Sequence, residues 1–201
     1  MSLVNPLRQG PVVFVSAVGS AEGARGAAAA LACAGAEADL AALLIDHGGR
    51  PPRPTLVASA AARTLEERLA MRLPEARVAA RGQVCHLVLP ADGDGLAAAA
   101  AAVAVARGST TAVHLPPELL QTALAVSSLS ASGVLLRADL TDDRALVGLT
   151  VRDLLAREVA ASVLKRRLGW VAERRALFGI LPPGAPGALP DRLVERLAGA
   201  V

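Results

Sequence analysis

Residues 11–32 (PVVFVSAVGSAEGARGAAAALA) form the stretch best suited to binding an anion. Val12–Ala17 is an apolar run with β-branched residues, which predicts a strand buried on both faces. Gly19–Gly26 contains three glycines, so its backbone can approach a ligand closely. Ala27–Ala32 consists of strong helix formers. A strand, a glycine loop and a helix N-terminus together offer unpaired N–H groups to a phosphate or another anion.

The side chains that process a nucleotide at such a loop are missing. A phosphate-binding loop needs a Lys after its last glycine and then a Ser or Thr for Mg²⁺. In this chain Ala24 and Arg25 follow Gly23, and the one lysine of the sequence is Lys165, far from the loop. The residues therefore indicate the ancestry of a site more clearly than an activity.

Other candidate side chains stand where predicted strands end, since ligands of parallel sheets bind at the carboxyl ends of strands. Asp46 ends the run AALLID and precedes a His-Gly-Gly turn, and His114 lies near the end of TTAVHL. Asp46 is either a relic metal ligand or a carboxylate that accepts from neighbouring backbone N–H groups. His114 is either a hydrogen-bonded structural residue or a ligand. His47 and His86 have no metal-ligand spacing with His114.

Apolar runs alternate with helical patterns along the chain, which predicts a parallel sheet covered on both faces. The expected fold class is α/β, with a doubly wound, mainly parallel sheet in a single domain of residues 1–201. The expected strands are Val12–Ala17, Ala41–Asp46, Val84–Leu89, Thr110–Leu115, Gly133–Ala138 and Val159–Leu164. The expected helices are Ala24–Cys33, Thr55–Leu73, Leu96–Arg107, Glu118–Leu129, Arg144–Glu158, Leu168–Phe178 and Asp191–Ala198.

The composition suits a cytoplasmic protein with a large core. Hydrophobic residues make up 53% of the 201, and aromatic residues are scarce, so Ala, Val and Leu must form the core. A formal net charge of +3 is too small by itself to indicate nucleic-acid binding. Cys33 and Cys85 both lie in apolar contexts and are expected to be buried free thiols. No signal peptide is expected, and the apolar stretch Leu96–Ala106 is too short to span a membrane.

Several motifs together resemble the ParA/MinD ATPases, most closely their CpaE/TadZ branch from pilus assembly. The stretch GSAEGARGAAAALA is similar to that branch's glycine loop and keeps Gly19, Gly23 and Ala24 in step. LLIDHGG keeps the acid of the family's second strand as Asp46, and SASGVLLRADL resembles another family strand. AVHLPPELL resembles the metal-binding strand, with His114 in the place of its Asp. VLKRRLG resembles the strand end that reads adenine, with Lys165 in the place of Asn.

The resemblance implies a P-loop NTPase-like fold, and the departures from it imply a non-catalytic protein. Mg²⁺ and Lys neutralise the charge that develops in phosphoryl transfer, so losing most of these groups removes the basis for ATP hydrolysis. The protein is therefore expected to be a pseudo-ATPase that acts as a scaffold or localisation factor in pilus or secretion assembly, without a cofactor or metal. The vestigial nucleotide-binding positions are Gly19, Ser20, Gly23, Ala24, Arg25, Asp46, His114 and Lys165.

Three alternatives stay open at this point. Arg25 could replace the phosphate Lys, which would make the protein a weak binder of ATP or ADP with Mg²⁺. A basic cluster around Trp170 could bind DNA or an acidic partner, or could be a solvated helix face; it comprises Lys165, Arg166, Arg167, Arg174 and Arg175. An unrelated small-molecule enzyme would need a pocket with convergent polar groups, which the sequence does not indicate.

Protein partners are expected, and two surfaces could make contact between copies of the chain. The family that the chain resembles pairs through its nucleotide face, which makes a homodimer plausible there. The apolar stretch Leu96–Ala106 is a second candidate contact, because a helix that is apolar all round should be covered on both sides. Stable membrane insertion and nucleic-acid binding are not expected.

Overall fold

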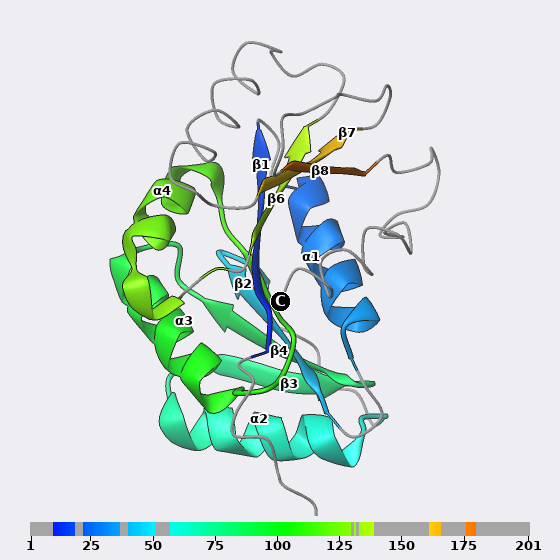
Figure 1. Cartoon of the computed structure of the whole chain (residues 1–201). Coiled ribbons are helices and arrows are strands. Elements are labelled where there is room, and N and C mark those ends of the chain that lie inside the picture. Colours follow the sequence, from blue (N-terminus) through cyan, green and yellow to red (C-terminus); the bar gives the residue numbers. More distant parts are fainter. Residues whose placement is uncertain are drawn as a thin grey trace, which may run out of the picture.

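The computed structural model describes residues 10–18, 22–36, 40–50, 57–129, 131, 133–138, 161–165 and 176–179. The described strands form one eight-stranded sheet in the order β3-β4-β2-β5-β1-β6-β7-β8 (Figure 1). Their bounds are β1 Val12–Val18, β2 Ala42–His47, β3 Arg77–Arg81, β4 Val84–Leu89, β5 Thr111–His114, β6 Gly133–Ala138, β7 Ala161–Lys165 and β8 Ala176–Gly179.

The sheet is parallel throughout its described pairs except at one edge. β3 runs antiparallel to β4, and every other neighbouring pair is parallel. The prediction of a mainly parallel α/β sheet is therefore confirmed. Each of the six predicted strands corresponds to a described strand, and β4 and β6 have the predicted bounds. In such a sheet, the ends of neighbouring strands bring residues distant in sequence to one edge.

Helices lie on both faces of the sheet (Figure 1). α1 (Glu22–Ala34) packs chiefly on β1, β5, β2 and β6, and its buried alanines contact Val13, Val15 and Leu44 in one core cluster. The opposite face carries α2 (Ala60–Arg72), α3 (Gly93–Val105) and α4 (Pro117–Ala125), followed by the short 3-10 helix η1 (Ser127–Leu129).

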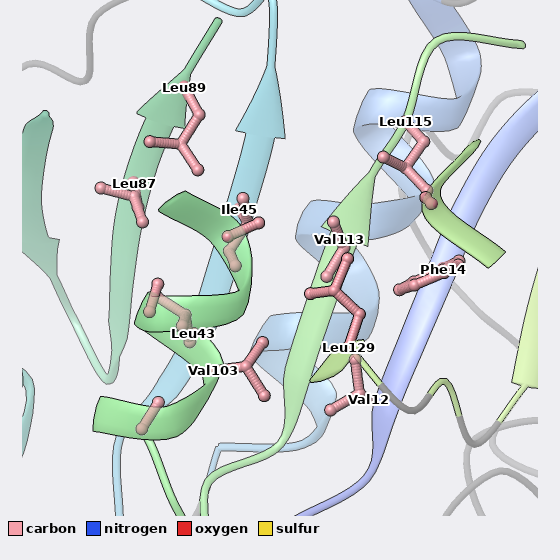
Figure 2. Packing of buried hydrophobic residues seen from close by; sticks show 14 of the residues in the cluster. Val12, Phe14, Leu43, Ile45, Leu87, Leu89, Val103, Val113, Leu115 and Leu129 are labelled. Carbon is pink, nitrogen blue, oxygen red and sulfur yellow. The ribbon is translucent and has the colours of Figure 1, made fainter. Parts of the chain in front are cut away.

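The larger core cluster lies under the three helices of that second face. Figure 2 shows Phe14, Ile45, Leu87, Val113 and Leu129 directed into it from separate elements. Strand residues of one parity belong to this cluster and those of the other parity to the α1 face, as expected for a sheet buried on both sides. With few aromatic residues, small and branched aliphatic side chains fill the interior.

Four predicted helices have different bounds in the structure. α1 begins at Glu22, so Gly23–Gly26 is helical and does not belong to a loop. α2 begins after Ser59, whose side chain accepts a hydrogen bond from the backbone N–H of Ala62 and caps the helix. α3 begins after Asp92, which caps it through the N–H of Gly95, and α4 ends at Ala125.

Two strands were not predicted. β3 (RVAAR) contains few residues with a high strand propensity, and its antiparallel pairing with β4 stabilises it as a strand. β8 occupies residues that were predicted to end the helix Leu168–Phe178, so that part of the prediction is wrong. The predicted helices Arg144–Glu158 and Asp191–Ala198 lie outside the described residues.

The two cysteines differ in burial. Cys85 is fully buried in β4, as predicted, and burial raises the pKa of its thiol to about 12. Cys33 is exposed on α1, so the prediction that both thiols are buried is wrong for Cys33. Within the described part of the chain, no helix has the length and apolar character needed to cross a membrane.

Candidate functional site

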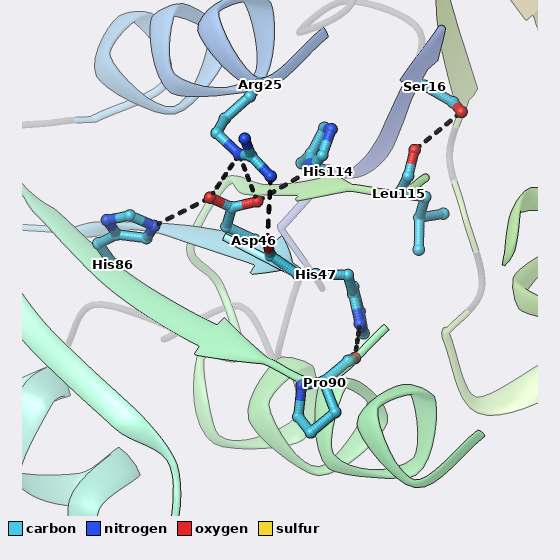
Figure 3. A network of polar contacts seen from close by, with 9 residues as sticks. Ser16, Arg25, Asp46, His47, His86, Pro90, His114 and Leu115 are labelled. Carbon is cyan, nitrogen blue, oxygen red and sulfur yellow. Dashed lines mark hydrogen bonds and ion pairs between the residues drawn. The ribbon is translucent and has the colours of Figure 1, made fainter. Parts of the chain in front are cut away.

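A buried carboxylate with partners from three other elements lies near the carboxyl end of β2 (Figure 3). Asp46 is only 1% exposed. Its oxygens lie 2.9 Å and 3.0 Å from Nε of Arg25 and 2.8 Å from Nδ1 of His114. Nε2 of His86 is 3.8 Å from Oδ2, which is too long for a direct hydrogen bond. Side chains from α1, β2, β4 and β5 therefore meet at one point.

The order of the strands explains why these side chains meet. β2 lies between β4 and β5, and Asp46 is directly in register with His114. Leu44 is in register with His86, which places His86 one step earlier on the same face as Asp46. Arg25 is near the start of α1, and its guanidinium reaches back over the sheet to the carboxylate.

Two glycines follow β2, and one of them makes room for the carboxylate. Gly48 has a φ of +70°, a conformation that an L side chain rarely adopts. A Cβ on Gly49 would meet the carboxyl group of Asp46 too closely to be tolerated without a shift. The His-Gly-Gly turn predicted from the sequence thus shapes the site as well as ending β2.

The surroundings of Asp46 favour its ionised form. Burial by itself would raise the pKa of this carboxyl group. The hydrogen bond from His114, the nearby His86 ring and the Arg25 guanidinium outweigh burial and hold the pKa well below its ordinary range. Asp46 is therefore a carboxylate at neutral pH, and since a carboxylate only accepts, Nδ1 of His114 carries the donated proton.

Three histidines place an unpaired ring nitrogen in or beside this site. Nε2 of His47, His86 and His114 is buried and has no hydrogen-bond partner among the described residues. His47 lies on the opposite face, where its Nδ1 donates to the carbonyl of Pro90 at 2.7 Å. Burial lowers the pKa of His47, although the bond to Pro90 opposes this shift. The surroundings of His47 thus lower its pKa and favour the neutral ring.

Arg25, Asp46 and His86 also line one end of a groove of about 940 Å³ beside α1. The groove continues along Leu44 and Val84 toward the turn between β3 and β4. The sequence did not predict a pocket, and the structure has a mainly apolar groove with Arg25, Asp46 and His86 at one end. Predicting this groove would have required knowledge of the strand order, because His86 and Asp46 become neighbours only through the pairing of β4 with β2.

The structure brings some predicted site residues together and leaves others apart. Arg25, Asp46 and His114 form one cluster. Ala24 is fully buried in the core beneath α1, so its position faces the sheet. Lys165 is the last residue of β7, two strands away from β1. Gly19, Ser20, Arg166, Arg167, Arg174 and Arg175 lie outside the described residues.

Among the described residues at this edge, Asp46 offers no free carboxylate oxygen to a Mg²⁺ ion. Mg²⁺ requires oxygen ligands in octahedral geometry, whereas both oxygens of Asp46 already accept from Arg25 or His114. Among the described residues, no group of three or more His, Cys, Asp and Glu side chains is arranged to hold a metal ion. Arg25 instead supplies the positive charge beside the carboxylate.

Comparison with models of known protein families and with curated proteins finds no match for this chain. Conclusions about function therefore depend on the geometry described above.

Proposed function

We propose that the protein is a non-catalytic, P-loop NTPase-like protein of the ParA/MinD type that acts as a scaffold or localisation factor. The resemblance of its motifs to the CpaE/TadZ branch suggests pilus or secretion assembly as the setting, with protein partners and a homodimer as the working form. The observation that carries this proposal is the ion pair between Arg25 and Asp46.

The ion pair supports a non-catalytic role through charge. In the family that the chain resembles, the acid at this strand end lies near Mg²⁺ and the attacking water. Here the guanidinium of Arg25 neutralises Asp46 from within the chain, and the N–H of His114 occupies the other oxygen. Phosphoryl transfer needs positive charge aimed at the phosphates, and an arginine already bonded to a carboxylate is poorly placed for that.

The burial of Ala24 supports the same conclusion. Ala24 stands in the position of the phosphate Lys, and it packs against the sheet with Ala27 and Ala28. A lysine there would have to leave the core to reach a ligand, because a buried unpaired ammonium group is strongly unfavourable. The site thus departs from an ATPase in packing as well as in side-chain chemistry.

Titration calorimetry with ATP and Mg²⁺, combined with a phosphate-release assay, tests this proposal. A catalytic ParA/MinD-type ATPase measured under the same conditions serves as the positive control. We expect no Mg²⁺-dependent heat of binding and no phosphate release above the rate without protein. Turnover at the rate of the control protein would refute the proposal.

Arg25→Ala separates this proposal from the weak-binder alternative. If the wild-type chain binds ATP and Arg25→Ala abolishes binding, Arg25 serves as a phosphate cation and the weak-binder alternative is correct. If neither chain binds ATP, while Arg25→Ala only lowers stability, the role of Arg25 is to hold Asp46. Thermal unfolding of both proteins gives the second readout.

A further inference from the structure

The groove beside α1 exists because α1 covers only part of its face of the sheet. α1 packs chiefly on β1, β5, β2 and β6, which leaves the α1-facing side of β4 and β3 beside it. One wall of the groove is a side of α1 that presents Arg25, Ala29 and Cys33, which are spaced by about one helical turn. Ala36, two residues beyond the end of α1, extends this wall. Leu44 and Val84 form the floor.

The lining of this groove is apolar in the middle and charged at its two ends. Leu44, Val84 and Ala29 contribute the apolar centre, and Val57, 80% exposed, contributes to the lining. At one end the Arg25–Asp46 ion pair and His86 close the groove with groups that already interact. A volume of about 940 Å³ lies within the range of small-molecule sites.

The opposite end has a positive charge that no described acidic side chain pairs with. Arg81 lies there with Gly82 and Gln83, at the turn between β3 and β4. Among the described residues Arg81 forms no ion pair, whereas Arg25 is paired with Asp46. The lining therefore has two arginines against one aspartate, and the uncompensated one is at the Arg81 end.

We propose that this groove binds a small amphiphilic anion, with its apolar body over Leu44 and Val84 and its acidic group beside Arg81. The distance from Gln83 to His86 along β4 is about 10 Å, a span that a medium-chain alkyl group covers. The apolar body removes the floor and Val57 from water, and the acidic group compensates the charge of Arg81. This proposal does not depend on the proposed scaffold function, although Arg25, Asp46 and His86 belong both to the groove and to the cluster described above.

Cys33 provides a direct assay, because its exposed thiol is part of the groove wall. Cys85 is buried with its pKa raised, so an uncharged alkylating reagent should modify Cys33 alone. The experiment measures the alkylation rate of Cys33 by N-ethylmaleimide with mass spectrometry. The probes are decanoate, decanol and decyltrimethylammonium, each below the concentration at which it forms micelles.

We expect saturating decanoate to slow alkylation at least about tenfold, decanol to protect less well, and decyltrimethylammonium not to protect. Arg81→Glu should raise the apparent dissociation constant for decanoate about fivefold to tenfold. This is the change expected when one exposed attractive charge pair becomes a repulsive one. Arg77→Glu is the matched control, because Arg77 is exposed on the same strand but does not line the groove. Its dissociation constant should stay within about twofold of wild type.

Ala29→Leu tests the position of the apolar body, since a larger side chain there fills the groove. Ala34→Leu, on an exposed position of the same helix outside the groove, is its control. Equal protection by decyltrimethylammonium, no protection by decanoate, or equal effects of Arg81→Glu and Arg77→Glu would each overturn the proposal. Protection that increases with protein concentration in the absence of a probe would also overturn it, in favour of a second copy of the chain.

Discussion

Replacing Asp46 with alanine should destabilise the protein by about 2–3 kcal/mol. The main cost comes from His114, which is 1% exposed and would lose the acceptor of its Nδ1 proton. A buried donor left without a partner costs about 1–3 kcal/mol. Arg25 contributes less, because its side chain is 41% exposed and water can solvate it once the carboxylate is gone.

Two double-mutant cycles that share Asp46→Ala separate these contributions. The cycle with His114→Ala should give a coupling free energy of about 2 kcal/mol, because both groups are buried. The cycle with Arg25→Ala should give about 0.5–1 kcal/mol, because that pair is half exposed to solvent. The predicted order of the two couplings follows from burial and not from distance, since the distances differ by only a tenth of an ångström: 2.8 Å and 2.9 Å.

Urea unfolding followed by far-ultraviolet circular dichroism measures all four free energies of each cycle. The Asp46→Ala variant should also melt about 5–10 °C lower, at roughly 2–4 °C per kcal/mol for a chain of this size. Asp94→Asn, an exposed acid in the first turn of α3, is the control and should cost about 0.5 kcal/mol or less. An Arg25 coupling equal to or larger than that of His114 would refute the reasoning from burial.

Four further outcomes are expected. Because the folded pKa of Asp46 is depressed, its contribution to stability is full above the unfolded pKa and is lost as the pH falls below about 5; Asp46→Asn should flatten that part of a pH–stability curve. In native protein at pH 8, a thiol reagent should titrate Cys33 and leave Cys85 unmodified until the protein is denatured. Gly49→Ala should displace the Asp46 carboxylate and lower the melting temperature, with a crystal structure of the variant showing the shift. Ser59→Ala should lower the free energy of unfolding in urea by about 1 kcal/mol through loss of the α2 cap, and Ser59→Asp should retain most of the wild-type stability.

Continuous apolar runs were enough to predict six of the seven strands that pair in parallel, all except β8. Val84–Leu89 and Gly133–Ala138 are strands with the predicted bounds, since a strand buried on both faces is a nearly continuous apolar run, interrupted here only by His86 and Arg137. Helix starts were less well predicted, because Glu22 and Gly93 precede the apolar residues from which a helical period is read.

The site was only partly predictable because its residues meet through strand order. Asp46 and His114 were candidates as residues near strand ends, but their hydrogen bond depends on β2 and β5 being neighbours. His86 was set aside since sequence spacing does not reveal a cross-strand neighbour. Arg25 was considered as a substitute for the phosphate Lys, and its ion pair with Asp46 depends on the position of α1 over the sheet.

The antiparallel edge strand β3 has a consequence for the solubility of the protein. A strand at the border of a sheet leaves backbone N–H and C=O groups open to pairing with another chain. β3 is short and has an exposed arginine at each end, Arg77 and Arg81, with a valine and two alanines between them. Charge repulsion between the arginines of two β3 edge strands should disfavour edge-to-edge pairing of two sheets. The two arginines should therefore reduce self-aggregation. Replacing both with valine should make the purified protein precipitate at concentrations where the native chain stays clear.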